Sequence, residues 1–291
     1  MPSLSASAIP DLPMAAFGCL GLAILAALLP IRGSASRGWC LPFLAACSLG
    51  LAGDTLDARA LASLAILGLI CAAYRHGRLP VSAPWLAGIL ALALALHRVP
   101  GFQPLLLLDN LVLSPGATPF TLRVGFDKAA AGLLLLVCFA PRCTRRDELG
   151  RSLRSALPLA ALTVALTLAA AWLGGRVAAD PKWPASAPVF LVSNLLFTCV
   201  AEEAFFRGLI QEGLHHRFAR LGPALPVALS SLLFAAAHLG GGLPHAALAG
   251  LAGLGYALVH ARSRRIEAAI LTHFSVNAVH FLGFTYPALA S

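Results

Sequence analysis

The sequence has few charged residues. Asp, Glu, Lys and Arg make up 11% of its 291 residues and hydrophobic residues make up 59%, whereas soluble domains carry about 25% charged residues. This composition excludes a soluble fold. The formal net charge is +9, but the basic residues sit in short clusters between apolar runs, and no soluble basic domain carries them. We therefore expect no nucleic-acid partner.

Several common signals are also missing. The seven cysteines form no C-x-x-C pair and have no regular spacing, so we interpret them as small buried hydrophobic residues. There is no fixed-period repeat, no low-complexity linker and no H-E-x-x-H zinc motif. The sequence thus excludes a disulfide scaffold and a repeat protein, and it lacks the common signature of a zinc protease.

Long apolar runs bounded by charge, Pro or Gly dominate the chain. They predict an all-α, polytopic transmembrane helical bundle of about ten spans, with eight or nine possible because several runs are short. The chain is therefore expected to be an integral, multi-pass membrane protein whose partner is the lipid bilayer. The predicted spans are 14–32, 39–53, 60–75, 81–96, 127–140, 155–174, 188–212, 222–239, 244–261 and 266–284.

The basic residues provide an independent test of this topology. Two thirds of the 21 Lys and Arg residues lie in the loops that follow the first, third, fifth, seventh and ninth predicted spans. Because cytoplasmic loops are enriched in Lys and Arg, these loops are expected to be cytoplasmic. Both termini are then expected outside the cytoplasm.

The longest connection, residues 97–126, contains four prolines and alternates short apolar and polar stretches. We interpret it as an interfacial or re-entrant segment. The chain is expected to divide into N-terminal transmembrane helices with this loop, residues 1–187, and a core with the chemistry-bearing residues, 188–291.

Ionisable residues inside spans are costly in hydrocarbon, by about 2.5–3.5 kcal/mol each on insertion scales, so each needs a partner or a function. The run FTCVAEEAFFRGLI places Glu202, Glu203 and Arg207 near the middle of a span. Glu203 and Arg207 are four residues apart and are predicted to pair. Glu202 points about 100° away from Glu203 and needs a different partner.

Two later spans carry polar side chains on one face. SLLFAAAHLGGG ends with His238, and THFSVNAVHF places His273, Asn277 and His280 at helical spacing. A carboxylate beside an imidazole can hold and deprotonate a water molecule. A further imidazole and an amide can donate hydrogen bonds to an oxyanion. The expected arrangement is that of a hydrolase.

These residues carry a resemblance. EEAFFR, FAAAH and HFSVN are similar to the E-E-x-x-x-R, F-x-x-x-H and H-x-x-x-N motifs of the CPBP family, which comprises CAAX prenyl proteases, bacteriocin-processing enzymes and abortive-infection proteins. The resemblance covers about residues 188–284. It implies a glutamic intramembrane endopeptidase of a bacterial inner membrane that acts on a membrane-anchored protein or peptide near its C-terminal segment.

The resemblance also implies residue roles. Glu202 and His238 would activate water, His273 and Asn277 would hold the oxyanion, and Glu203 and Arg207 would support them, with no cofactor. Two alternatives stay open. In one, zinc sits between Glu202, His238 and His273 in a metalloprotease. In the other, the chain is a non-catalytic membrane immunity or transport protein.

Overall fold

The computed structural model describes residues 11–31, 37–80 and 82–290. Arg32, which belongs to the first basic loop, lies outside the described residues. Aspartate side chains cap the N-terminal ends of two helices. Asp57 accepts hydrogen bonds from the backbone N–H groups of Arg59 and Ala60, and Asp11 accepts one from Met14. The helices are thus bounded by polar residues, while their interiors are apolar.

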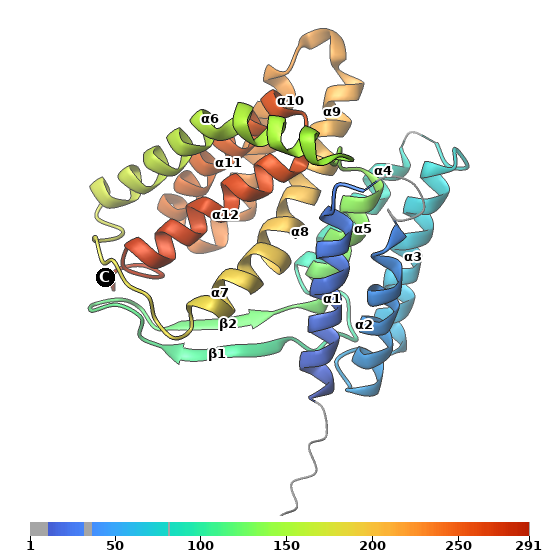
Figure 1. The fold of residues 1–291 in the computed structure, drawn as a ribbon, viewed down its shortest axis with the longest axis horizontal. Coiled ribbons are helices and arrows are strands. Elements are labelled where there is room, and N and C mark those ends of the chain that lie inside the picture. Colours follow the sequence, from blue (N-terminus) through green and yellow to red (C-terminus); the bar gives the residue numbers. More distant parts are fainter. Residues whose placement is uncertain (1–10, 32–36, 81, 291) are drawn as a thin grey trace, which may run out of the picture.

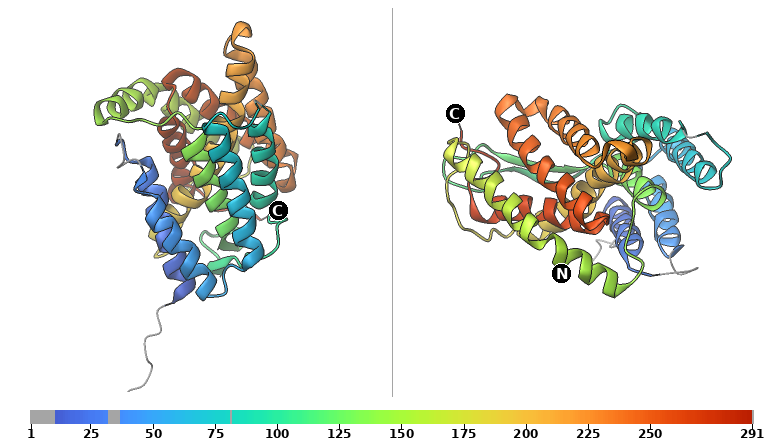
Figure 2. Two further views of the ribbon diagram at one scale, coloured as in Figure 1. Left: turned by 90° about the vertical axis from the view of Figure 1, so that its right-hand side faces the viewer. Right: turned by 90° about the horizontal axis from the view of Figure 1, so that it is seen from above.

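The N-terminal helices form one group (Figure 1). They are α1 (Leu12–Leu28), α2 (Cys40–Ala52), α3 (Ala58–Arg75), α4 (Ala83–Ala95) and α5 (Phe126–Cys138). A second group lies on the other side of the molecule, as the view from above shows (Figure 2, right). Its members are α6 (Arg146–Leu173), α10 (Ala224–Ala237), α11 (Leu243–Ser263) and α12 (Ile266–Gly283).

A long helix, residues 187–217, stands between the two groups and contacts α5 on one side and α10 and α12 on the other. It is not a uniform α-helix. Its segments are α7 (Ala187–Ser193), η2 (Asn194–Cys199), α8 (Val200–Glu203), η3 (Ala204–Gln211) and α9 (Glu212–Arg217), of which η2 and η3 are π-helical. Since π-helical turns change the direction of the side chains that follow, they often mark functional sites.

Every predicted span coincides with a helix in the described part of the chain. By length and composition, four helices are able to cross a membrane: Ala58–Arg75, Arg146–Leu173, Ala187–Arg217 and Leu243–Ser263. Shorter apolar helices cover Leu12–Leu28, Cys40–Ala52, Ala83–Ala95 and Ala224–Ala237. The chain is therefore a mostly helical membrane protein, and the count of ten spans stays a prediction.

The fold is not all-α, however. Within residues 97–126, β1 (Leu105–Leu111) and β2 (Phe120–Val124) pair as an antiparallel hairpin along the lower edge of Figure 1. The alternating apolar and polar residues of this segment suit a two-stranded sheet, which the four prolines obscured in the sequence. The all-helical fold class is wrong for this segment.

The main hydrophobic cluster joins residues from both sides of the predicted boundary at 187. It contains Phe17 and Leu133 from the first part and Cys199 and Ile270 from the second. A close approach between α5 and α8 tightens this contact. A Cβ atom on Gly132 would lie 2.5 Å from the Cα of Ala201, so only glycine fits there. The two-part division stays a prediction.

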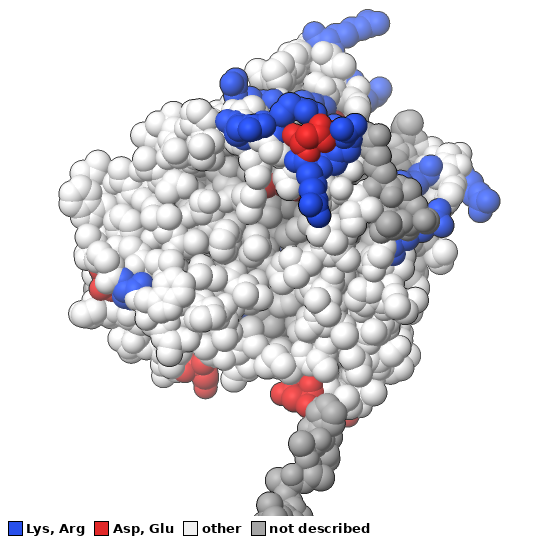
Figure 3. Space-filling view, in the orientation of Figure 1, with Lys and Arg blue, Asp and Glu red and all other residues white. Residues whose placement is uncertain are grey.

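Basic residues gather at one end of the helices. In Figure 3 the Lys and Arg atoms lie mainly at the upper end, where Figure 1 places α9 and the beginning of α6. Acidic atoms appear at the lower end, near the described start of the chain. The distribution has the asymmetry expected of a membrane protein with its positive end toward the cytoplasm.

Candidate active site

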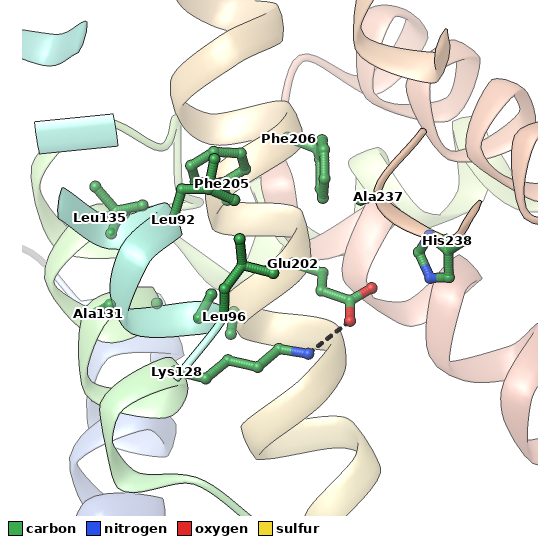
Figure 4. A pocket seen from close by; sticks show the side chains of 14 residues that line it. Leu92, Leu96, Lys128, Ala131, Leu135, Glu202, Phe205, Phe206, Ala237 and His238 are labelled. Carbon is green, nitrogen blue, oxygen red and sulfur yellow. Dashed lines mark hydrogen bonds and ion pairs between the residues drawn. The ribbon is translucent and has the colours of Figure 1, made fainter. Parts of the chain in front are cut away.

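Glu202 lies on α8, between the two π-helical segments. Its side chain is paired, because the Lys128 ammonium on α5 donates a hydrogen bond to Glu202 Oε1 over 2.7 Å (Figure 4). Gly132, one turn after Lys128, lets α5 approach α8 closely enough for this contact. The sequence predicts that Glu202 needs a partner other than Arg207, and that partner is a lysine from the N-terminal helices.

His238 follows the last residue of α10. Its Nδ1 lies 2.7 Å from the carbonyl oxygen of Phe234. Because a carbonyl only accepts, Nδ1 must carry the proton, and this leaves Nε2 free to accept or donate one. In Figure 4 the imidazole faces the Glu202 carboxylate, and no direct hydrogen bond between the two is found.

Glu203, Arg207 and His273 form a buried network. Arg207 donates to Glu203 Oε1 over 3.0 Å and to the carbonyl of Gly253 over 2.7 Å. Nδ1 of His273 lies 2.9 Å from the same Oε1, and its Nε2 lies 3.9 Å from Glu202 Oε2. The predicted pairing of Glu203 with Arg207 is therefore present, and it extends to His273.

Aromatic rings enclose this network. The Arg207 guanidinium lies 4.8 Å from the ring centre of Phe234, within cation–π range. The same ring packs against His238 at 4.5 Å between centres. Tyr256 stacks on His273 with 4.6 Å between ring centres and 14° between planes. These contacts fix the orientations of both imidazoles.

Asn277 is oriented by a different helix. Its Nδ2 donates a hydrogen bond to Oδ1 of Asn194 over 3.2 Å, and the thiol of Cys199 donates to the same oxygen. Asn194 thus bridges the long helix and α12. The same Nδ2 also donates to the Cys199 sulfur over 3.7 Å. Because sulfur is a weak acceptor, a bound oxygen could compete for this N–H group.

Two cavities meet at Glu202 and His238. The first, of about 140 Å³, is lined by Lys128 and by small or apolar residues of α4 and α5. The second, of about 240 Å³, is lined by the complete predicted quartet Glu202, His238, His273 and Asn277. Glu202 and His238 line both cavities. A substrate that extends from one cavity into the other would therefore pass beside these two side chains.

The sequence patterns did not identify three residues near the quartet, namely Lys128, Tyr256 and His245. Lys128 contacts Glu202, whereas the neighbouring Asp127 contacts Nδ1 of His97 at 2.7 Å. Tyr256 and His245 both line the larger cavity, as does His280. The available signal for Lys128 was its position on an apolar helix, where a charge needs a partner.

At the far end of the long helix, Glu212 is the centre of another polar cluster. Arg264 donates to its Oε1 over 2.6 Å, and Nε2 of His260 lies 3.3 Å from its Oε2. His216 contacts Glu212 as well. His260 is fully buried, and this carboxylate provides its partner.

The residues proposed for zinc are engaged with other groups. Glu202 pairs with an ammonium and His273 with Glu203. Across residues 11–31, 37–80 and 82–290, no group of three His, Cys, Asp or Glu side chains is arranged to hold a metal ion. A divalent cation beside Lys128 would also be repelled.

Fold and site together define the class as a helical membrane protein with a polar cluster buried where two cavities meet. Residues 184–279 match the family described as type II CAAX prenyl endopeptidase Rce1-like. The resemblance to the CPBP family is confirmed for this region, about a third of the chain, and it supports a hydrolase of the CAAX-type intramembrane endopeptidases. No curated protein and no solved structure matches the chain.

Proposed function

We propose that the chain is a glutamic intramembrane endopeptidase in which Glu202 and His238 activate a water molecule. The observation that carries this proposal is that both side chains line both cavities, with His273 and Asn277 in the wall of the larger one. A water molecule held between the carboxylate and the imidazole has a proton acceptor on each side.

The reaction is the hydrolysis of a peptide bond. Glu202 accepts a proton as the water oxygen bonds to the carbonyl carbon, and His238 Nε2 orients the attacking water. The proton then passes to the amide nitrogen as the C–N bond breaks. Lys128 balances the negative charge of Glu202, which would otherwise stand alone in a low-dielectric environment.

His273 and Asn277 hold the oxyanion of the tetrahedral intermediate. Asn277 offers the amide N–H that otherwise donates to the Cys199 sulfur. His273 donates from Nε2 when Glu203 stabilises the doubly protonated ring through Nδ1. Removal of one such donor typically lowers the rate by about 10²–10³. Glu203 and Arg207 are positioning residues, because they act through His273.

The substrate is a membrane-anchored protein or peptide cleaved near its C-terminal segment. The smaller cavity has walls of Ala91, Ala95, Ala131 and Gly132, which suit small apolar side chains. The larger cavity adds polar groups and holds the reacting bond. The site needs no cofactor.

We propose an inner bacterial membrane as the location, with both termini on the non-cytoplasmic side. The clustering of arginines at one end of the helices supports this orientation. A fluorescent protein that folds only in the cytoplasm, fused after the C-terminus, should stay dark, whereas alkaline phosphatase at the same position should be active. The opposite pair of results would contradict the orientation.

Catalysis is tested by comparing membranes from cells that express the wild-type chain, Glu202→Gln or His238→Asn. We expect new protein termini in the wild-type sample, found by terminus-selective proteomics, and their loss in both variants. The matched controls Glu267→Gln and His260→Asn alter a buried Glu and a buried His outside both cavities, and they should retain cleavage. Equal cleavage by wild type and Glu202→Gln would refute the proposal.

The zinc alternative predicts a different outcome. A metalloprotease would lose activity in the presence of a chelator and regain it with Zn²⁺, whereas the Lys128–Glu202 pair favours activity that a chelator does not change. A transport or immunity protein would produce no termini that depend on Glu202. The proteomic comparison, made with and without a chelator, therefore separates all three functions.

A further inference from the structure

A third cavity, of about 800 Å³, lies among α2, α3 and α5, and none of the proposed catalytic residues lines it. Its polar lining is basic. Arg37, Arg75, Arg142 and His76 face it, and its described lining includes no Asp or Glu. The volume falls within the range of ligand cavities, roughly 300–1,000 Å³. The cavity is large enough for a ligand with more atoms than a single phosphate ion.

The arginines keep most of their hydrogen-bonding capacity. Arg75 donates to the carbonyl of Val137 over 2.7 Å, and Arg142 donates to the carbonyl of Ala27. Each guanidinium has five N–H donors, so several remain on each. Arg37 is exposed and has no hydrogen bond or ion pair with any residue that the structure describes.

The positive charges are only partly balanced internally. Arg142 lies in the loop after α5, and burial lowers the pKa of its guanidinium. The negative charge of Glu267 offsets part of this effect, whereas the positive charge of Arg75 lowers the pKa further. An anion in the cavity would relieve the repulsion between Arg75 and Arg142. Guanidinium groups bind phosphate through paired N–H donors, and the N-terminal end of α2, at Trp39 and Cys40, adds a favourable dipole.

An apolar strip continues from the basic residues. Gly68 and Ala72 of α3 face Leu134 and Val137 of α5 in the same cavity. A Cβ atom on Gly68 would meet nothing within 4 Å, so this part is open. Because the arginines lie at helix ends and the strip runs along helix interiors, the cavity has the polarity of a lipid, charged at one end and apolar along the other.

We propose that this cavity binds an anionic phospholipid, with its phosphate on Arg37, Arg75 and Arg142 and the start of an acyl chain along Gly68 and Leu134. Basic pockets between transmembrane helices on the cytoplasmic side are suited to such headgroups. The inference is independent of the proposed peptidase, since it uses neither the quartet nor its cavities.

The test uses the purified full chain in detergent with equal amounts of phosphatidylglycerol and phosphatidylcholine of identical acyl chains. Native mass spectrometry measures the lipid retained. The wild type should retain phosphatidylglycerol preferentially. The double variant Arg37→Gln/Arg75→Gln should lower this retention by about fivefold for each arginine removed. The control Arg78→Gln/Arg220→Gln removes two exposed arginines outside the cavity and should retain the lipid.

Two more variants keep the result interpretable if the double variant unfolds. Arg37→Gln alone removes none of the contacts found in the described chain, and Gly68→Leu fills the apolar strip without changing charge. Both should lower phosphatidylglycerol retention. Equal retention of the two lipids, or equal loss in the control, would overturn the proposal. Displacement of the lipid by inorganic phosphate alone would assign the cavity to a free anion and would also overturn it.

Discussion

The ammonium of Lys128 lies 2.7 Å from the carboxylate of Glu202, although 73 residues separate them in the chain. Lys128 lies outside the region that matches the Rce1-like family, residues 184–279, whereas Glu202 lies inside it. The charge balance of the candidate site thus depends on a helix that the family match does not include.

Replacement of Lys128 by Met should abolish most of the activity, by about 10²-fold or more, because the activated water depends on an ionised Glu202. Lys128→Arg keeps the charge and should retain part of the activity. Rates of substrate cleavage and protein levels in the membrane are the measurements. If Lys128→Met cleaves the substrate like the wild type while Lys128→Arg does not, the positive charge of Lys128 is not required for activity.

Loss of Arg207 should act mainly on stability. The Glu203–Arg207 pair is fully buried, and removal of one partner from such a pair costs about 3–5 kcal/mol. Arg207→Met should therefore lower the melting temperature and the amount of protein in the membrane. Arg217→Gln, an exposed arginine on the same long helix, should change stability by less than about 0.5 kcal/mol. Equal melting temperatures for the two variants would contradict a structural role for the pair.

Gly132→Ala should separate α5 from α8. The added Cβ would lie 2.5 Å from the Cα of Ala201, and since this is backbone, the helices must shift. Overpacking of this kind costs typically about 1–3 kcal/mol, and it should lengthen the Lys128–Glu202 contact and lower activity. Gly18→Ala, where an added Cβ meets nothing within 4 Å, is the control for thermal unfolding and cleavage. Identical behaviour of the two alanine variants would argue against the close contact.

Stability should fall in acid partly through Asp180, in the loop between α6 and α7. A hydrogen bond from the Ser114 hydroxyl lowers the pKa of Asp180 below its ordinary value of 3.8. Partial burial raises this pKa, and the nearby Lys182 ammonium lowers it again by a smaller amount. A carboxyl with a lowered folded pKa stabilises the fold above the unfolded value, and this contribution is lost as pH falls from about 4 through the folded pKa. Asp180→Asn should flatten that part of a melting-temperature profile. Asp109→Asn, at an exposed position of the hairpin, should leave the profile unchanged.

Sequence patterns predict the helices well because a backbone in lipid must satisfy its own hydrogen bonds, so long apolar runs become helices. They also place Glu202, His238, His273 and Asn277, since each is a polar residue on an apolar span. The roles of these four residues stay predictions. What the patterns identify is the need for partners at these positions.

Patterns do not identify which partners are chosen. Lys128 meets Glu202 only because α5 and α8 approach closely at Gly132, and this is a property of tertiary packing. Similarly, His260 lies near a span end but is buried against Glu212, which belongs to another helix. The β-hairpin was missed because its strands are short and prolines surround them, and short apolar segments are ambiguous between structural types.

The long helix that carries Glu202 is anchored on both sides of it. On the N-terminal side of Glu202, Asn194 accepts a hydrogen bond from Asn277 of α12. On its C-terminal side, Glu212 contacts Arg264 and His260. Neither rotation nor sliding of this helix is possible without breaking one of these attachments. We therefore expect Glu202 to be stationary during turnover, so that admission of a substrate requires a neighbouring helix, such as α4 or α10, to swing away from it.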